Sequence, residues 1–243
     1  MSLRSVLLAC LLLAACLPPP TRAAGTDDDR DWSPTLGLDL GHLGSTSSLV
    51  VLGVAGLTAA WAWEETDETF PALQRSLDAS LFDGAYDVGN VYGGGLLIGG
   101  GAAGLLAYGA LTDHPGARTF GTDLARSFAA SALVSGALKV SIDRRRPSGG
   151  SLSFPSGHTT SAFSTVPVIW HHLGWPGGVA AGALATLTAC GRMEENRHYL
   201  SDVIAGAAIG FVTGAAVVAQ RRRTEGAASL VVTPRSVGLA WSF

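Results

Sequence analysis

The stretches KVSIDRRRP (139–147), PSGH (155–158) and RMEENRHYLSD (192–202) decide how this chain of 243 residues is interpreted. Within them, ten residues stand at fixed spacings and supply three cations, two imidazoles and one carboxylate. Such a set can hold a phosphoryl group while it passes from an oxygen to a nitrogen atom. The six charged or titratable side chains are Lys139, Arg146, Arg192, His158, His198 and Asp202.

Lys139 is the only lysine among the 16 basic residues of the chain, and the other 15 are arginines. An ammonium group is a compact charge that behaves differently from the planar fork of a guanidinium. A sequence that otherwise uses arginine therefore indicates a specific need for lysine at this position.

His198 and Asp202 are four residues apart, so on a helix they share one face and can form a hydrogen bond. A carboxylate on one ring nitrogen fixes the tautomer and leaves the other nitrogen free to attack phosphorus. Taken alone, such a pair is more often a structural hydrogen bond. Arg192 and the other two blocks favour the catalytic interpretation here.

Pro155, Ser156 and Gly157 precede an apolar run that is predicted to be helical. Ser156 suits the N-cap position, and the backbone N–H groups of the first turn form an anion site. Ordinary capping is the alternative for these three residues alone. His158 favours the anion site, because an imidazole beside a bound phosphate can give a proton to a departing oxygen near neutral pH.

In this order and with these spacings, the three blocks resemble the signature of the type 2 phosphatidic acid phosphatase superfamily, over about residues 90 to 220. The resemblance implies hydrolysis of a phosphate ester through a phosphohistidine on His198, with Asp202 orienting the ring and His158 as the general acid. The family usually has serine where this chain has Gly191, which leaves one hydroxyl hydrogen bond to phosphate in doubt. The expected phosphate-binding residues are Lys139, Arg146, Ser156, Gly157 and Arg192.

Six apolar stretches rich in alanine, glycine and leucine are predicted to be helices, because they lack alternation and exceed strand length. The expected fold is an all-α, membrane-associated bundle of about six helices of the superfamily's kind. Only the second and sixth stretches approach the roughly 20 apolar residues that cross a bilayer. Asp123 and Arg126, inside the third, favour protein or water over lipid. The stretches are 48–63, 91–111, 122–140, 160–174, 177–190 and 203–220.

Residues 1–23 have the layout of a secretory signal, and Cys16 ends a segment that resembles a bacterial lipobox. We expect an acidic, glycine-rich leader over 24–47, a helical phosphatase domain over 48–220, and a short tail over 221–243 in which two extended segments can form a hairpin. The expected location is the bacterial cell envelope, with the active site facing the periplasm or the exterior. Three apolar stretches precede Lys139 where this orientation needs an even number of crossings. We therefore expect either that one of them does not span or that the bundle is only peripherally attached.

Several other functions are disfavoured by the sequence. A net charge of −3 gives no basic surface for nucleic acid. The glycines at 93–104 follow no strand and precede no Lys-Ser/Thr pair, so helix packing explains them better than a nucleotide loop. No Asp, Glu or His group has convincing metal-ligand spacing, and adjacent His171 and His172 face different ways on a helix. A reaction without metal or cofactor is expected.

The leading hypothesis is a phosphatase acting on a lipid phosphate or diphosphate at a membrane. One alternative is a soluble, secreted acid phosphatase of broad specificity, and another is a non-catalytic envelope protein that retains the pocket. Vanadium haloperoxidases, which share the superfamily, are a more remote alternative. Arg144 and Arg145 either attract an anionic headgroup or form a solvated face. The sequence does not specify which phosphate is the substrate.

Overall fold

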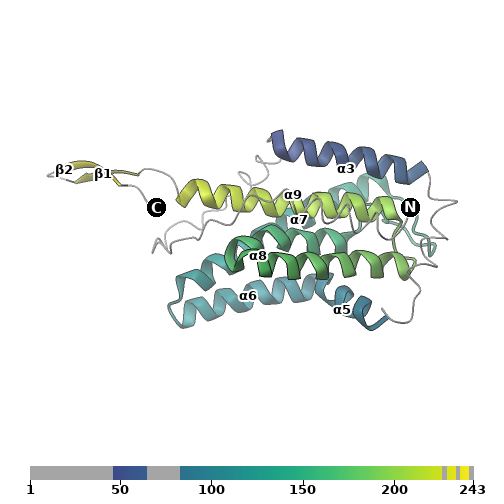
Figure 1. The fold of residues 1–243 in the computed structure, drawn as a ribbon, viewed down its shortest axis with the longest axis horizontal. Coiled ribbons are helices and arrows are strands. Elements are labelled where there is room, and N and C mark those ends of the chain that lie inside the picture. The colour runs from purple at the N-terminus through teal and green to yellow at the C-terminus, as the bar shows by residue number, and fades with distance from the viewer. Residues whose placement is uncertain (1–45, 65–82, 226–228, 234–235, 241–243) are drawn as a thin grey trace.

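The computed structural model describes residues 46–64, 83–225, 229–233 and 236–240. Residues 1–45 lie outside this part, and they contain the proposed signal segment (1–23) and all but the last two residues of the proposed leader (24–47). Helices account for most of the described residues, and they lie side by side in an elongated bundle (Figure 1). The helices are α3 (Thr46–Glu64), α5 (Asp83–Gly93), α6 (Gly95–Leu111), α7 (Pro115–Ile142), α8 (Gly157–Glu194) and α9 (Leu200–Glu225).

The second apolar stretch, predicted as one helix over 91–111, forms two helices. The first of them, α5, already begins at Asp83, and the chain bends by 57° between α5 and α6. Gly94, at the break, has an extended backbone conformation with φ −66° and ψ 125°. Hydrophobicity alone did not reveal this break, since apolar residues continue on both sides of it.

The fourth and fifth apolar stretches form the two halves of α8, which is broken at Gly174 with φ 74° and ψ −173°. This left-handed region strongly favours glycine, because no Cβ has to be accommodated. The chain turns back at this point. The surroundings of Gly93 in α5 demonstrate this reversal. A Cβ there would lie 2.9 Å from the carbonyl oxygen of His158, near the beginning of α8, and 2.3 Å from the Thr188 side chain, near its end. The two ends of α8 therefore lie at the same end of the bundle.

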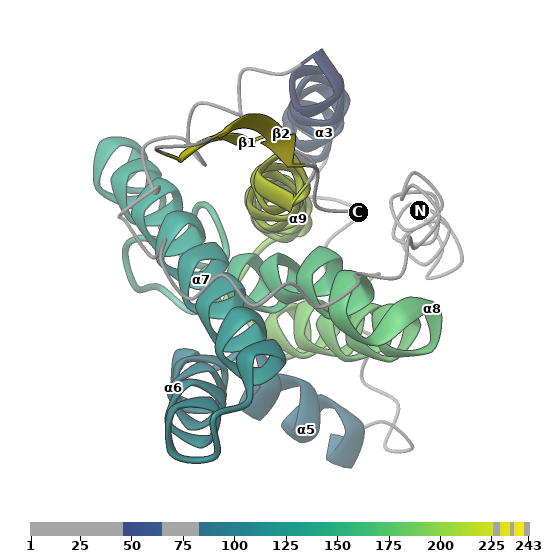
Figure 2. The same ribbon diagram turned by 90° about the vertical axis from the view of Figure 1, so that its left-hand side faces the viewer.

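Helix α9 occupies the middle of the bundle, where it packs against α3, α7 and α8 (Figure 2). Glycines spaced by four residues bring its backbone very close to the first half of α8. A Cβ on Gly210 would lie 2.2 Å from the carbonyl oxygen of Thr160, and one on Gly214 would lie 2.2 Å from that of Ser164. Small residues at this spacing allow two helix backbones to approach closely. The contact holds the beginning of α8 in register with the beginning of α9.

Two of the described helices, α8 and α9, are long and apolar enough to cross a membrane, and α5 with α6 gives a third if the bent pair is one span. The apolar part of α3 is shorter, and α7 is not among these candidates. Large apolar side chains cover the outside of the bundle, with Leu96 91% exposed and Leu111 85% exposed. The predicted fold class, an all-α membrane-associated bundle, is confirmed for the helices of the described part.

Asp123 lies inside the bundle. This agrees with the expectation that a charged residue within the third apolar stretch faces protein or water and not lipid. Its carboxylate is fully buried in α7, accepts a hydrogen bond of 2.9 Å from Arg221 of α9 and lies 3.0 Å from Nε2 of His172 in α8. These contacts join the first part of α7, the turn in the middle of α8 and the last part of α9, at the end of the bundle away from the three sequence blocks. The imidazole of His172 thus has the Asp123 carboxylate as its partner.

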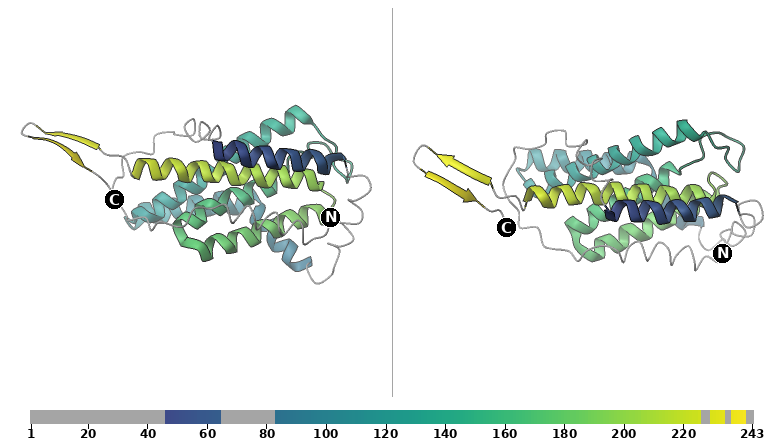
Figure 3. Two further views of the ribbon diagram at one scale, coloured as in Figure 1. Left: turned by 45° about the horizontal axis from the view of Figure 1, so that its top comes forward. Right: turned by 90° about the horizontal axis from the view of Figure 1, so that it is seen from above.

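Beyond α9, the strands β1 (Ser229–Thr233) and β2 (Ser236–Ala240) form an antiparallel hairpin. Ser229 pairs with Ala240, and Thr233 pairs with Ser236. Figure 3 shows the hairpin projecting past the end of α9, away from the other helices. It lies at the opposite end of α9 from Asp202 and takes no part in the site described next.

Candidate active site

The three sequence blocks meet at one end of the bundle. Here α7 ends, α8 both begins and ends, and α9 begins, because α8 reverses at Gly174. The short loop between α7 and α8 closes over this end. All eight residues predicted for the site belong to these helix ends or to the segments that join them.

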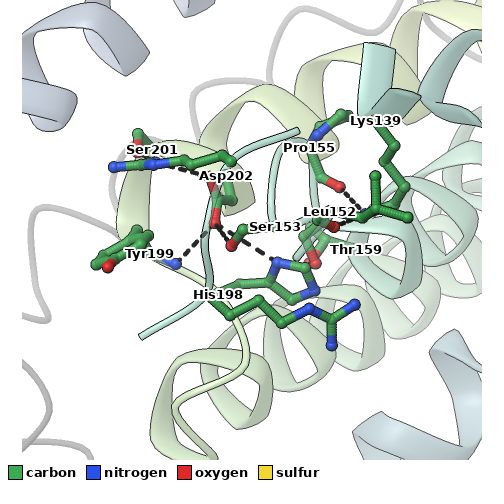
Figure 4. A network of polar contacts seen from close by, with 12 residues as sticks. Lys139, Leu152, Ser153, Pro155, Thr159, His198, Tyr199, Ser201 and Asp202 are labelled. Carbon is green, nitrogen blue, oxygen red and sulfur yellow. Dashed lines mark hydrogen bonds and ion pairs between the residues drawn. The ribbon is translucent and has the colours of Figure 1, made fainter. Parts of the chain in front are cut away.

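Asp202, in the first turn of α9, is the most heavily hydrogen-bonded side chain of the site (Figure 4). It is fully buried. Its Oδ1 accepts a hydrogen bond of 2.7 Å from Arg144, and its Oδ2 accepts bonds of 2.5 Å from the Ser153 hydroxyl and 3.0 Å from the backbone N–H of Tyr199. A buried carboxylate needs such partners, since a lone ion away from water is very costly. The orientation of Asp202 is therefore fixed from three directions.

His198 lies beside this carboxylate, just before α9. Its Nδ1 is 3.5 Å from Oδ2 of Asp202, which is an ion-pair distance and longer than a normal hydrogen bond. Within the described part of the chain, Nδ1 has no hydrogen-bond partner. Catalytic hydrogen bonds are often long before substrate binds. Burial lowers the pKa of His198 despite the opposing effect of Asp202, which favours the neutral form of the ring.

The ammonium group of Lys139, in the last turn of α7, binds the loop that leads into α8. Nζ donates hydrogen bonds of 2.8 Å to the carbonyl oxygen of Leu152 and 2.6 Å to that of Pro155 (Figure 4). An ammonium has three donors, so one remains for a ligand. Burial, with the neighbouring charge of Arg146, lowers the pKa of Lys139 to about 8.

Ser156 occupies the N-cap position of α8, as predicted, but its hydroxyl does not cap the helix. The hydroxyl lies 2.9 Å from Oγ1 of Thr159, while the backbone N–H of Ser156 donates to the carbonyl oxygen of Asp202 at 2.9 Å. The first-turn N–H groups are thus left uncapped by this side chain. Gly157 lies next to Lys139, since a Cβ there would be 3.5 Å from Cε of the lysine.

His158 is half-buried in the first turn of α8. The charges of Arg192, His198 and Arg146 all act on its ring, so the structure brings side chains from all three blocks to one place. The same convergence appears at His198, which is within electrostatic range of Lys139 and Arg146. The predicted clustering of the eight residues is therefore what the fold produces, whereas their individual roles remain predictions.

Arg192, in the last turn of α8, forms an ion pair through Nη2 with Glu195. Glu195 also accepts a hydrogen bond from Asn90 of α5. The Nε of Arg192 is buried and has no partner among the described residues. Arg146 donates from Nε to the carbonyl oxygen of Ser151 at 3.0 Å. The loop and Glu195 thus hold both guanidinium groups beside the histidines.

Gly191 departs from the superfamily pattern, and its surroundings give a steric reason. A Cβ at this position would lie 3.1 Å from Oδ1 of Asn90 and 3.1 Å from Cβ of Tyr86. Both distances are tighter than ordinary van der Waals contact. The close approach of α5 therefore leaves little room for a serine side chain.

Sequence reasoning missed Arg144 and Ser153, the two side chains that bind Asp202 directly. Arg144 was left open as a headgroup-attracting or solvated residue, and neither description is right, since its side chain is only 11% exposed and pairs with Asp202. Its neighbour Arg145 is exposed. In the sequence both are members of one run of three arginines, and only the tertiary structure separates them.

No cluster of three or more His, Cys, Asp or Glu side chains that could hold a metal ion is found in the described ranges. His171 and His172 are T-shaped to each other with ring centroids 5.0 Å apart. His172 faces Asp123, whose Oδ2 lies 3.0 Å from its Nε2.

Comparison with known proteins agrees with the resemblance drawn from the three blocks. Residues 148–225 match the family model of the PAP2 superfamily. The superfamily resemblance inferred from the three blocks is thereby confirmed over this part of the chain, which contains the second and third blocks. Lys139 and Arg146 of the first block precede the matched residues.

Two individual proteins are similar to this chain. A lipid A 1-phosphatase from Porphyromonas gingivalis is 40% identical over 81 residues, which are 31% of this chain and 18% of that protein. The chain thus aligns with less than a fifth of the relative's length. A transmembrane PAP2-type phosphatidylglycerolphosphate phosphatase from Bacillus subtilis superposes with a TM-score of 0.42 and 19% identity, over 90% of this chain and 95% of that one.

Proposed function

We propose that this protein is a phosphatase that removes a phosphoryl group from a lipid phosphate or diphosphate through a phosphohistidine on His198. The observation that carries the proposal is the meeting of a buried His-Asp pair, a second histidine and three cations around the uncapped first turn of α8. Each of these groups corresponds to one requirement of phosphoryl transfer, and they come from three separate parts of the sequence.

In the first step, Nε2 of His198 attacks phosphorus. Asp202 lies on the Nδ1 side, so it can hold the Nδ1–H tautomer and stabilise the positive charge that develops on the ring. The N–P bond forms while the bond between phosphorus and the departing oxygen breaks. His158 donates a proton to that oxygen, because a departing alkoxide is otherwise a poor leaving group.

In the second step, water attacks the phosphohistidine, with His158 now accepting the proton of the water. The O–P bond forms as the N–P bond breaks, and inorganic phosphate leaves. Lys139, Arg146 and Arg192 act together with the first-turn N–H groups of α8, beginning at Gly157, to stabilise the negative charge on the equatorial oxygens in both steps.

A membrane-bound lipid is the substrate class that the outside of the bundle favours. Apolar residues near the site end are strongly exposed, such as Val140 at 77% and Ile142 at 41%. Exposed apolar side chains next to a group of charged residues suit a substrate with a phosphate head and a hydrocarbon tail. The similar protein from Porphyromonas gingivalis is, by its name, also a lipid phosphatase. We further propose export, with the site facing the periplasm or exterior of a bacterial envelope.

The proposal is tested by trapping the intermediate. Purified protein is incubated with a ³²P-labelled phosphatidyl or polyprenyl phosphate and quenched. We expect acid-labile, alkali-stable label on His198, and His198→Ala should lose both label and turnover. His172→Ala, which changes a histidine outside the site, is the matched control and should retain label. Label on a residue other than His198 would refute the assignment.

The substrate panel separates the remaining alternatives. Lipid phosphates and soluble monoesters are compared in the presence of EDTA, with the protein in detergent and after attempted detergent-free extraction. Equal rates on soluble monoesters by a detergent-independent protein would favour the secreted acid phosphatase. Absence of turnover on every phosphate ester would favour a non-catalytic envelope protein.

A further inference from the structure

We propose that Arg144 is a positioning residue that fixes the Asp202 carboxylate and thereby sets the tautomer of His198. The inference rests on the proposed function, in which His198 attacks phosphorus. It assigns to Arg144 a role distinct from that of Arg146, two residues later, which belongs to the phosphate-binding set.

The two oxygens of Asp202 have different partners. Oδ1 binds Arg144 at 2.7 Å, whereas Oδ2 faces His198 at 3.5 Å and binds Ser153 at 2.5 Å. A carboxylate can rotate about its last torsion in a broad, twofold manner. The charged bond to Arg144 makes one orientation the favoured one, because charge-assisted hydrogen bonds are about twice as strong as neutral ones.

Arg144 is itself held by several contacts. Its Nη1 also donates to the Ser201 hydroxyl at 2.6 Å. Its guanidinium lies 3.6 Å from the ring centroid of Trp63 and 4.1 Å from that of Tyr199. Stacking on aromatic faces is a property of guanidinium groups that lysine reproduces less well. The arginine is thus clamped between α3 and the segment before α9.

These contacts also separate Arg144 from the phosphate-binding cations. Its side chain is 11% exposed, and its charge is directed at a carboxylate of the protein. A residue that acts only through Asp202 should affect the chemical step and leave substrate binding nearly unchanged. Loss of Arg144 should therefore lower kcat, while KM stays close to that of the wild type.

The experiment compares Arg144→Gln and Arg144→Lys with Arg145→Gln. The last variant is the matched control, since Arg145 is the exposed neighbour in the same arginine run. We expect Arg144→Gln to lower kcat about 10²-fold, the cost of a small misplacement in an active site, with KM changed less than about twofold. Arg144→Lys should recover part of this loss, and Arg145→Gln should be active like the wild type. All are first checked for an unchanged thermal unfolding midpoint in detergent.

A second measurement does not depend on turnover. The ¹⁵N chemical shifts of the His198 ring distinguish the Nδ1–H from the Nε2–H tautomer and report its titration. We expect Nδ1–H in the wild type and in Arg145→Gln, and a mixture of tautomers in Arg144→Gln. An unchanged His198 tautomer in Arg144→Gln overturns the inference, as does a raised KM with unchanged kcat.

The two measurements also separate failure of this inference from failure of the proposed function. If the wild type hydrolyses no phosphate ester, the proposed function fails, while the ring shifts still decide whether Arg144 controls His198. If the wild type is active and labelled on His198 but the Arg144 variants keep their tautomer, only the inference fails. Should Arg144→Gln unfold, Arg144→Lys carries both measurements.

Discussion

Lys139 and Pro155 are joined by a hydrogen bond of 2.6 Å from the lysine Nζ to the proline carbonyl oxygen, across 16 residues of sequence. The only lysine of the chain thereby connects the end of α7 to the residue that precedes the N-cap of α8. A second bond, to Leu152, fixes the same loop. The lysine thus fixes the segment that leads into α8, in addition to supplying a charge.

This relationship predicts that Lys139→Arg is poorly active although the charge is conserved. A planar guanidinium cannot reproduce the bonds that a compact ammonium makes to two carbonyl oxygens. We expect kcat/KM to fall about 10²-fold, the order of effect that misplacement of catalytic groups produces, with little change in the unfolding midpoint. Arg145→Lys, the reverse exchange at an exposed position, is the control. Wild-type rates in Lys139→Arg would show that the ammonium has no special role.

The pKa of Lys139 predicts an alkaline limb in the pH profile. Burial lowers this pKa to about 8, so the ammonium loses its proton, and the site one positive charge, as the pH rises through that value. We expect kcat/KM, which reports the free enzyme, to decrease above about pH 8. In Lys139→Arg the residual activity should lack this limb, since a guanidinium stays charged. A limb at the same pH in both proteins would assign it to another group.

His158→Ala should affect substrates according to their leaving groups. A general acid contributes about 10²–10⁴-fold when the departing oxygen needs a proton, and an aryl oxide needs it much less than an alkoxide. We therefore expect a large loss on an alkyl or lipid phosphate and a small loss on an aryl phosphate. The rates of both substrates are measured in wild type and variant. An equal loss on the two would mean that His158 positions phosphate without donating the proton.

The close contact of α9 with α8 predicts the effect of a single methyl group. Gly210→Ala would place Cβ 2.2 Å from the carbonyl oxygen of Thr160, a backbone atom that cannot move alone. We expect destabilisation by about 1–3 kcal/mol, as for other overpacked positions. Gly136→Ala on α7 meets nothing within 4 Å and should stabilise by about 0.5–1 kcal/mol. Denaturation midpoints in detergent measure both, and similar shifts would contradict the packing argument.

Much of the fold could be predicted because its signals are local. Apolar stretches longer than strands gave the helices, and Asp123 indicated that its part of α7 faces protein. The break at Gly94 was not predictable in this way, because the residues around it are equally apolar. The reversal at Gly174 fell at the last residue of the predicted stretch 160–174, where a glycine next to Trp175 and Pro176 marks a turn.

The same distinction between local and long-range signals decides which site residues could be predicted from the sequence. Fixed spacings identified the residues that meet around the first turn of α8, since those spacings are properties of the sequence itself. Arg144 and Ser153 bind Asp202 from 58 and 49 residues away, and no local pattern distinguishes them from their neighbours. Ser156 is the opposite case. The sequence identified it as a suitable N-cap residue, but its hydroxyl contacts Oγ1 of Thr159 and does not cap α8.

The reversal at Gly174 has a practical consequence for following this protein in a membrane. Each half of α8 contains about 17–20 helical residues, so at 1.5 Å per residue the turn lies about 25–30 Å from the histidines. Trp175, at this turn, is 62% exposed. A fluorescent or spin label placed there would report on the opposite surface of the bundle, and so on its orientation in a vesicle, without disturbing the chemistry at the other end.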